Sequence, residues 1–146
     1  MLPTWVFDID GTLANGSHRK HFLDQKPRKW DEWEKLLHLD TPNHDIVFFL
    51  HLGKAIGMSI VICTGRSEET RKRTEQWLVD HGITYDMMYM RPAKDYRDDS
   101  VIKKEALEKM RMAGYDPKVV FDDRDRVVKM WRDQGIRVLQ VAEGNF

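Results

Sequence analysis

The chain has 146 residues, of which 41% are hydrophobic and 33% are charged, and its formal net charge at pH 7 is zero. This composition excludes a disordered chain and excludes binding to nucleic acid through bulk positive charge, and the length predicts a single domain over residues 1–146. The apolar runs are too short to cross a membrane and no basic segment precedes an apolar signal core, so we expect a cytoplasmic protein without a membrane partner.

The first predicted element is a strand over residues 5–7, which ends abruptly in two carboxylates, a glycine and a hydroxyl. Its apolar residues suit a buried parallel strand, and Gly11 with Thr12 supplies a turn. Asp8 and Asp10 lie two residues apart, so on an extended chain they face the same side. Two like charges held so close need a cation or a proton. An Asx-type turn is the alternative, but the whole string favours a catalytic carboxylate pair.

An insert of about residues 15–42 follows this strand and has no clear period before a short amphipathic helix that starts at Trp30. Basic side chains beside aromatic ones, such as Trp30 and Trp33, suit a nucleic-acid strand. The alternative, which the sequence favours slightly, is a solvated basic loop with both tryptophans packed inward. Between Arg19 and Lys29 the basic residues are Arg19, Lys20, Lys26, Arg28 and Lys29.

Helices and strands then alternate to the end of the chain, which predicts parallel strands joined by right-handed crossovers in a three-layer α/β/α sandwich with a mostly parallel, Rossmann-like sheet. One strand contains the single cysteine, Cys63, which allows no internal disulfide and is expected to pack in the core. The predicted helices cover residues 43–56, 67–81, 99–112 and a segment through 127–131 that stops at Gly135. The predicted strands cover residues 58–63, 85–90, 118–121 and 137–141.

Polar side chains follow three of the predicted strands at their carboxyl ends, where open α/β sheets bind ligands. Four carboxylates in one cleft need compensating charge, which we expect from Lys103 and from Mg²⁺, an ion that prefers hard oxygen ligands. We expect those ligands to include carboxylates of Asp8 and of the Asp122-Asp123 pair, and a backbone carbonyl near Asp10. The converging residues are Asp8, Asp10, Thr64, Asp122 and Asp123.

The sequence resembles the haloacid dehalogenase (HAD) superfamily, whose members are mostly aspartate-nucleophile phosphotransferases. The four motifs of that superfamily are matched in order by Asp-x-Asp-Gly-Thr, Thr64, Lys103 and the Asp122-Asp123 pair. The resemblance is closer still to the 3'-phosphatase domain of phage-type polynucleotide kinase-phosphatases. It lies in Phe-Asp-x-Asp-Gly-Thr-Leu-Ala, Gly65-Arg66, Arg91-x-x-x-Asp95-x-Arg97, Asp122-Asp123-Arg124 and the ending Gln140-Val141-Ala142-x-Gly144-x-Phe146. No G-x-x-x-x-G-K-[ST] loop occurs, so the kinase half of that family is absent from this sequence.

This resemblance and phosphoryl-transfer chemistry together imply roles for the motif residues. Asp8 is expected to be the nucleophile and to form an aspartyl-phosphate. Asp10 is expected to protonate the leaving alcohol and then to accept a proton from water. The Thr64 hydroxyl and the Gly65 amide would hold phosphoryl oxygens, and Lys103 would neutralise their charge.

Three further residues become candidates for substrate binding because they match the family pattern by position. They are Arg19, Arg66 and Asp99. Asp99 also lies four residues before Lys103 on a predicted helix, the spacing at which an acid and a base meet, so we expect it to orient the lysine. The insert from His21 to Asp40 is less similar to the family, which leaves substrate choice open.

The resulting hypothesis is a Mg²⁺-dependent phosphomonoester hydrolase for nucleic-acid repair, with phosphorylated nucleic-acid ends or nucleotides as its substrates. It would remove 3'-phosphates from polynucleotide ends or from nucleotides. One alternative is a small-molecule phosphatase for 5'-nucleotides, with Trp30 and Trp33 of the insert acting as a lid. A second alternative is a non-catalytic nucleic-acid-binding module that retains the fold, although every polar group that catalysis requires is present.

Overall fold

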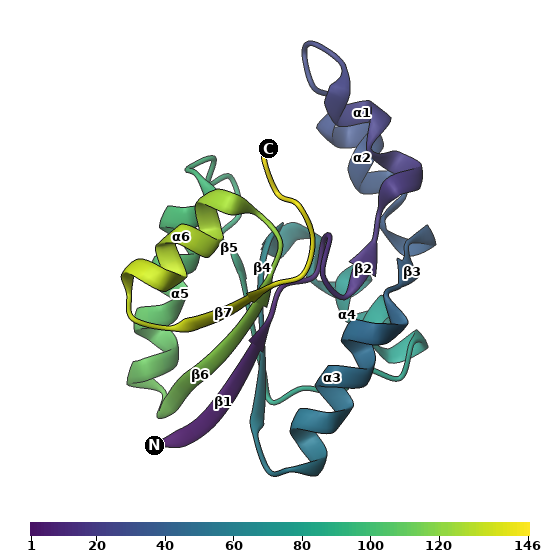
Figure 1. Cartoon of the computed structure of the whole chain (residues 1–146). Coiled ribbons are helices and arrows are strands. Elements are labelled where there is room, and N and C mark those ends of the chain that lie inside the picture. The colour runs from purple at the N-terminus through teal and green to yellow at the C-terminus, as the bar shows by residue number, and fades with distance from the viewer.

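A five-stranded parallel sheet forms the centre of the computed structural model, which describes residues 1–146 (Figure 1). The strand order is β5-β4-β1-β6-β7, so the first strand of the chain lies in the middle and helical crossovers lead outward on both sides. This confirms the predicted α/β sandwich with a parallel sheet. The strands are β1 (Leu2–Phe7), β4 (Ser59–Ser67), β5 (Met87–Arg91), β6 (Tyr115–Asp122) and β7 (Arg137–Gln140).

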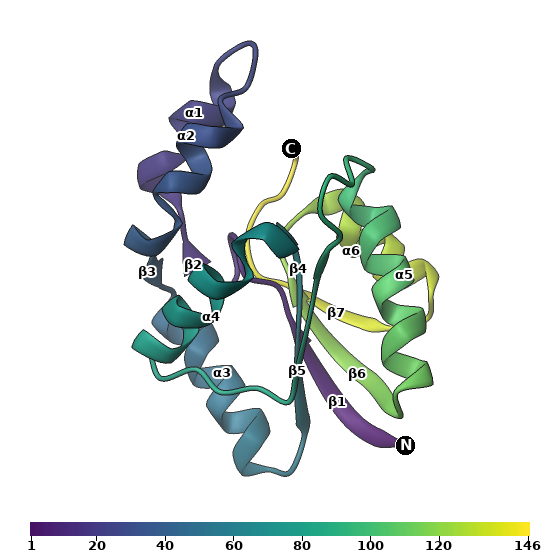
Figure 2. The same ribbon diagram turned by 180° about the vertical axis from the view of Figure 1, so that it is seen from behind.

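Helices cover both faces of the sheet, as the opposite views of Figures 1 and 2 show. On one face lie α3 (His44–Ala55) and α4 (Arg71–Asp80), and on the other lie α5 (Asp99–Met112) and α6 (Asp125–Asp133). Successive residues of a strand point to opposite faces. Phe7 of β1 therefore packs toward α3 and α4, whereas Val6 packs toward α5 and α6.

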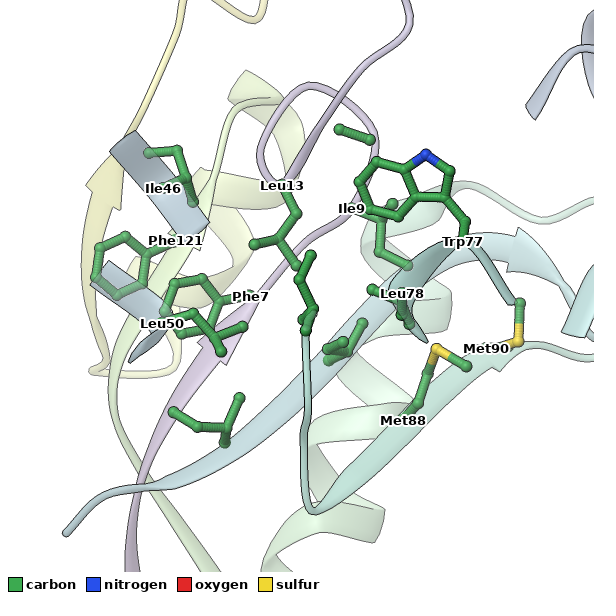
Figure 3. Packing of buried hydrophobic residues seen from close by; sticks show 14 residues of the cluster. Phe7, Ile9, Leu13, Ile46, Leu50, Trp77, Leu78, Met88, Met90 and Phe121 are labelled. Carbon is green, nitrogen blue, oxygen red and sulfur yellow. The ribbon is translucent and has the colours of Figure 1, made fainter. Parts of the chain in front are cut away.

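The core on the α3 and α4 side is built around aromatic rings of neighbouring strands (Figure 3). The rings of Phe7 and Phe121 stack with their centroids 4.4 Å apart and an interplanar angle of 3°. Leu50 of α3 and Trp77 of α4 are buried against the same cluster. Since this packing fixes β1 against β6, it also fixes whatever follows these two strands at their carboxyl ends.

The register of β1 determines which side chains meet at the edge of the sheet. Phe7 pairs with Ile62 on β4 and with Phe121 on β6. Asp8 directly follows β1 and Asp122 is the last residue of β6, and the Asp8 amide donates to the Phe121 carbonyl at 3.0 Å. The two acids therefore lie on adjacent strands at the carboxyl edge of the sheet.

Cys63, the single cysteine, lies on β4 and is 2% exposed. It belongs to the cluster formed with α5 and α6, as expected for a core residue. Burial raises the pKa of its thiol to about 12. The thiol is therefore neutral at physiological pH and packs as a small apolar side chain.

The insert between β1 and α3 begins and ends in a short antiparallel ribbon, in which β2 (Ala14–Asn15) pairs with β3 (Thr41–Pro42). Its helices lie beyond the carboxyl ends of the strands, on the same side of the molecule as the C-terminus (Figure 1). The insert therefore leaves and rejoins the sheet at one narrow base. Between the two strands of the ribbon lie η1 (Ser17–Arg19), α1 (His21–Asp24), α2 (Trp30–Lys35) and η2 (Leu37–Leu39).

Several element boundaries differ from those predicted, and pairing with neighbouring strands explains the largest changes. β4 continues to Ser67, which pairs with Arg91 after a register shift, so the next helix starts later, with η3 (Glu68–Thr70) before α4. β6 starts at Tyr115, since Leu2 of β1 pairs with it.

Trp30 is 49% exposed, so the interpretation in which both tryptophans pack inward is wrong for this residue. None of the helices has the length and apolar character needed to cross a bilayer.

Candidate active site

Three buried carboxylates and one buried lysine meet at the carboxyl ends of β1 and β6. One oxygen from each of Asp8, Asp122 and Asp123 lies within 4.8 Å of the others, and none of these residues is more than 5% exposed. Lys103 of α5 donates from Nζ to Asp8 Oδ1 at 2.9 Å and to Asp122 Oδ2 at 2.9 Å. This arrangement brings together four of the residues that the sequence predicted for the site.

Neighbouring groups hold two of these carboxylates in place. The Thr12 hydroxyl donates to Asp8 Oδ2 at 3.2 Å, and the Trp131 indole of α6 donates to Asp122 Oδ2 at 3.3 Å. Gly11 has φ +83°, and a Cβ there would lie 2.1 Å from Asp123 Oδ2. A glycine is therefore required at this turn both for its backbone conformation and for the space beside the acidic cluster.

The cluster carries more negative charge than its lysine can balance. Burial and the neighbouring Asp122 raise the pKa of Asp8 well above its ordinary value, and Lys103 opposes this only in part. Burial and Asp122 also raise the pKa of Asp123 from 3.8 to about 6. Burial alone would lower the pKa of Lys103, but Asp122 and Asp8 raise it, so the lysine stays charged. A further cation would relieve the excess negative charge.

The donor set fits Mg²⁺, because it consists of carboxylate oxygens that are buried, close together and short of positive charge. Asp8, Asp122 and Asp123 are the side chains that could hold the ion. The carboxylate of Asp10 lies outside this cluster, since it accepts hydrogen bonds from Arg66 and Arg19. Only its backbone carbonyl remains available to a metal at this position.

Asp10 lies instead in a ring of alternating acids and arginines. Its Oδ2 accepts from Arg66 Nε at 3.0 Å, and its Oδ1 accepts from Arg66 Nη2 at 2.7 Å and from Arg19 Nη2 at 2.8 Å. Arg19 in turn donates from Nε and Nη2 to the two oxygens of Asp40, at 2.8 and 2.7 Å. The ring closes with a bond of 3.3 Å from Arg66 Nη2 to Asp40 Oδ2.

The ring sets the charge of Asp10. Burial would raise the pKa of this carboxyl, but the guanidinium groups of Arg66 and Arg19 lower it to about 2. Asp10 is therefore a carboxylate in the resting protein. Both arginines are almost completely buried, and Arg19 Nη1 is a buried side-chain nitrogen without a hydrogen-bond partner.

Thr64 and Gly65 lie within β4 and directly before Arg66 of the ring, not beyond the end of the strand as predicted, and their neighbours were not foreseen. Thr64 is 1% exposed, and its Oγ1 accepts from the backbone amide of Arg66 at 3.1 Å. Gly65 lies against Asp99, since a Cβ at this glycine would be 2.7 Å from Asp99 Oδ1. The strand therefore passes between the arginine ring and the start of α5.

The prediction that Asp99 orients Lys103 is wrong. Its Oδ2 accepts from Arg124 Nη1 at 2.7 Å, and its Oδ1 accepts from Arg91. Lys103 is bound by Asp8 and Asp122 instead. The spacing of four residues allows a pair on the helix surface, but here stronger partners from other elements take both side chains.

Sequence reasoning missed several residues that contact predicted site residues, among them Asp40 and Trp131. Asp40 ends the insert and gave no local signal, because its partners Arg19 and Arg66 are far away in the chain. Trp131 was assigned only to the apolar face of its helix, although its indole also reaches Asp122. A search for acids without a local role inside the insert would have found the first of these.

The site contains a buried aspartate beside a lysine and further acids. Comparison with known protein families agrees with this arrangement. The family model of the polynucleotide kinase PNKP phosphatase domain matches residues 3–146. The chain belongs to this family. As a PNKP-type phosphatase domain it is an enzyme of the HAD type, which confirms the resemblance stated from the motifs.

Individual relatives agree with this assignment and are longer than this chain. A protein of Autographa californica nuclear polyhedrosis virus, named "Putative bifunctional polynucleotide kinase/RNA ligase", is 27% identical over 128 residues, which are 86% of this chain and 17% of the viral protein. A chain of the Pnkp1/Rnl/Hen1 RNA repair complex is 29% identical, with a TM-score of 0.87 over 100% of this chain and 44% of that one. This domain thus spans less than half of either relative.

More distant solved structures share the fold of this PNKP-type domain. The class C acid phosphatase from Bacillus anthracis with tungstate bound has a TM-score of 0.74 at 17% identity, covering 99% of this chain and 68% of that one. CbbY from Rhodobacter sphaeroides in complex with phosphate has a TM-score of 0.65 at 14% identity, covering 100% and 88%. At this identity, the similarity establishes the fold alone.

Proposed function

We propose that this PNKP-type domain is a Mg²⁺-dependent phosphomonoesterase that removes 3'-phosphates from polynucleotide ends through an aspartyl-phosphate intermediate. The observation that carries the proposal is Asp8, a buried carboxylate bonded to Lys103 and to Thr12 beside two further acids. A carboxylate fixed in this way can attack phosphorus, and the other groups can balance the charge of the phosphoryl group.

In the first step, a carboxylate oxygen of Asp8 attacks phosphorus and the bond from phosphorus to the 3'-oxygen breaks. Lys103 neutralises charge on the phosphoryl oxygens, and the Thr64 hydroxyl and the Gly65 amide hold them. In the second step, water attacks phosphorus of the aspartyl-phosphate, which restores Asp8 and releases inorganic phosphate. Magnesium, held by Asp8, Asp122 and Asp123, would supply positive charge beside the phosphoryl group.

Asp10 serves as the acid in the first step and as the base in the second. In the resting protein it is ionised but only weakly basic, because Arg66 and Arg19 lower the pKa of this carboxyl to about 2. A bound phosphate competes with Asp10 for the same two guanidinium groups, and Arg19 Nη1 has no other partner. This competition raises the pKa of Asp10, so that it takes up the proton that the leaving 3'-oxygen needs.

The raised pKa of Asp123 makes the stability of the metal-free domain depend on pH. The pKa of Asp123 is about 6 in the folded protein and 3.8 in the unfolded chain. Between these two pH values the folded protein holds a proton on Asp123 that the unfolded chain has released. This contribution to stability is present at low pH and is lost as the pH rises through about 6. About one pH unit of the interval between 3.8 and 6 lies above pH 5, and it corresponds to about 1 kcal/mol, at 1.36 kcal/mol per pH unit.

We therefore expect the metal-free domain to be less stable at about pH 7.5 than at about pH 5, and Mg²⁺ to raise the unfolding temperature mainly at the higher pH. Thermal unfolding with chelator and with Mg²⁺ at both values measures this. Asp123→Asn removes the titration of this carboxyl and should weaken the dependence, the remainder of which comes from the raised pKa of Asp8. Asp10 does not interfere, since its pKa of about 2 places its titration below this range. Equal effects of Mg²⁺ at both pH values would contradict the metal site.

The preference for a polynucleotide is supported by the surface of the insert. Lys26, Arg28 and Lys29 are exposed, and the Arg28 guanidinium lies 5.9 Å from the ring centroid of the exposed Trp30. Exposed basic groups and an aromatic face together suit single-stranded nucleic acid. Phosphate release from 3'-phosphorylated DNA and RNA oligonucleotides, 5'-phosphorylated oligonucleotides, 3'-mononucleotides and 5'-mononucleotides tests the preference. Faster turnover of 5'-mononucleotides would favour the nucleotidase alternative.

Replacing Lys26, Arg28 and Lys29 together by Ala should slow oligonucleotide turnover while leaving a mononucleotide nearly unaffected. Each lost phosphate contact lowers the slope of log affinity against log salt by about 0.7 for a single strand. Oligonucleotide KM measured across a salt series reports this slope. The matched control removes two lysines and one arginine, Lys54, Lys109 and Arg111, which are exposed near the C-terminal ends of α3 and α5. Equal losses on both substrates would exclude strand binding by the insert.

A further inference from the structure

Asp40 is an acid that the mechanism above does not use, yet it is buried in the centre of the site. Its side chain is 0% exposed, and it follows η2 at the end of the insert. The Trp77 indole of α4 donates to its backbone carbonyl at 2.8 Å, and β3 starts directly after it. The backbone is therefore held from both sides, which gives the carboxylate a defined position.

Asp40 and Asp10 share the same two guanidinium groups in a reciprocal manner. Arg19 gives two bonds to Asp40 and one to Asp10, whereas Arg66 gives two bonds to Asp10 and one to Asp40. Two acids and two arginines make the ring electrically neutral. His18 adds a contact from its Nε2 to Asp40 Oδ1 at 2.7 Å.

The two acids differ in their access to a substrate. The side chain of Asp10 is 30% exposed, whereas that of Asp40 is completely buried. A phosphate can therefore replace Asp10 at the guanidinium groups, but it cannot replace Asp40. Once Asp10 turns away, Asp40 still holds Nε and Nη2 of Arg19 and remains bonded to Nη2 of Arg66. The arginines keep their orientation while their contacts with Asp10 are exchanged.

The ring of Trp33 restricts Arg19 from a further direction, since the guanidinium carbon lies 3.9 Å from the ring centroid. Stacking on this ring and bidentate bonding to Asp40 together leave Nη1 as the end of Arg19 without a partner. A bidentate arginine-carboxylate pair fixes the plane of the guanidinium as well as its distance. Asp40 thus determines where the unpaired N–H groups of Arg19 are directed.

We propose that Asp40 is a positioning residue, which fixes Arg19 and Arg66 to receive the phosphate that displaces Asp10. The inference rests on the proposed phosphatase function and extends it to a residue of the insert. The insert is then part of the phosphate-binding site, because Asp40, the residue between η2 and β3, orients the two arginines. Asp40 itself does not touch the reacting atoms.

The test is a comparison of Asp40→Asn, which keeps the size of the side chain but removes its charge, with Asp31→Asn, the same substitution at an exposed site of the insert. Loss of a residue that orients a binding group reduces activity by roughly 10- to 100-fold. We expect such a loss in kcat/KM for a 3'-phosphorylated oligonucleotide and for para-nitrophenyl phosphate alike. We expect no loss for the control.

A double-mutant cycle separates positioning from a general effect on the fold. Because Asp40 accepts two bonds from Arg19 and only one from Arg66, Asp40→Asn should cost clearly less in an Arg19→Ala background than in the wild type. An equal loss in both backgrounds would overturn the proposal. The affinity for inorganic phosphate, measured by calorimetry in the Asp8→Asn protein, should fall with Asp40→Asn and supplies a readout that does not depend on turnover.

Asp40→Glu covers the case in which the Asn variant does not fold, because it keeps the charge and displaces the guanidinium groups by one methylene. We expect a folded protein with reduced kcat/KM, and wild-type activity in this variant would overturn the proposal. The proposed function is judged separately by Asp8→Asn. An active Asp8→Asn protein rejects the nucleophile, whereas an inactive one with a fully active Asp40→Asn rejects only the positioning role.

Discussion

Asp8→Asn is expected to abolish phosphate release, with a loss of roughly 10⁴-fold or more, as for the removal of other catalytic nucleophiles. An amide cannot form the aspartyl-phosphate on which turnover depends. The fold should persist, because the substitution removes a charge that is already unfavourable. Burial and Asp122 raise the pKa of Asp8 well above its ordinary value. Metal-free Asp8→Asn protein should therefore unfold at the same or a higher temperature than the wild type at neutral pH.

Steady-state assays and thermal unfolding of the same preparation test both parts of this expectation. Asp133→Asn, an exposed acid on α6, is the matched control and should retain full activity. Acid quenching of the wild type during turnover should trap phosphate on the protein, and Asp8→Asn should trap none. More than trace activity in the variant would remove Asp8 from the role of nucleophile.

Lys103→Met is expected to abolish activity and also to destabilise the metal-free domain, by about 3–5 kcal/mol, the usual cost of breaking a buried ion pair. The lysine is 2% exposed and is bonded to both Asp8 and Asp122. Without it, three carboxylates would remain buried together with no neighbouring cation. The two substitutions therefore have similar effects on turnover and opposite effects on stability.

Urea unfolding in the presence of chelator measures this difference. Lys104→Met is the matched control, since the neighbouring residue lies on the same helix but is exposed. Adding Mg²⁺ should recover part of the lost stability of Lys103→Met without restoring turnover. An unchanged unfolding midpoint for Lys103→Met in chelator would show that the lysine does not balance the acidic cluster.

The residues at the strand ends could be predicted because parallel strands bring their carboxyl ends to one edge. Asp8 and Asp122 each follow an apolar run, and pairing of those runs is enough to bring the two acids together. Lys103 came from the requirement for compensating charge and from the family motif. In these cases a local pattern and a general rule of sheet topology were sufficient.

The contacts of Asp40 and Asp99 could not be predicted because they depend on arginines from distant elements. Asp99 was assigned to Lys103 from helix spacing, but Arg91 and Arg124 reach it from β5 and from the segment before α6. Asp40 lies 21 residues after Arg19 and 26 before Arg66 in the chain. No periodicity connects such residues, and only the folded insert brings them together.

The burial of Cys63 makes the domain convenient for site-specific labelling. Its thiol is the only one in the chain, is 2% exposed and has a pKa of about 12, so maleimide reagents should not modify it in the folded protein. A cysteine introduced at Gln25, an exposed residue between α1 and α2, would then be the single reactive position. A fluorophore attached there could report oligonucleotide binding and movement of the insert without first removing a native cysteine.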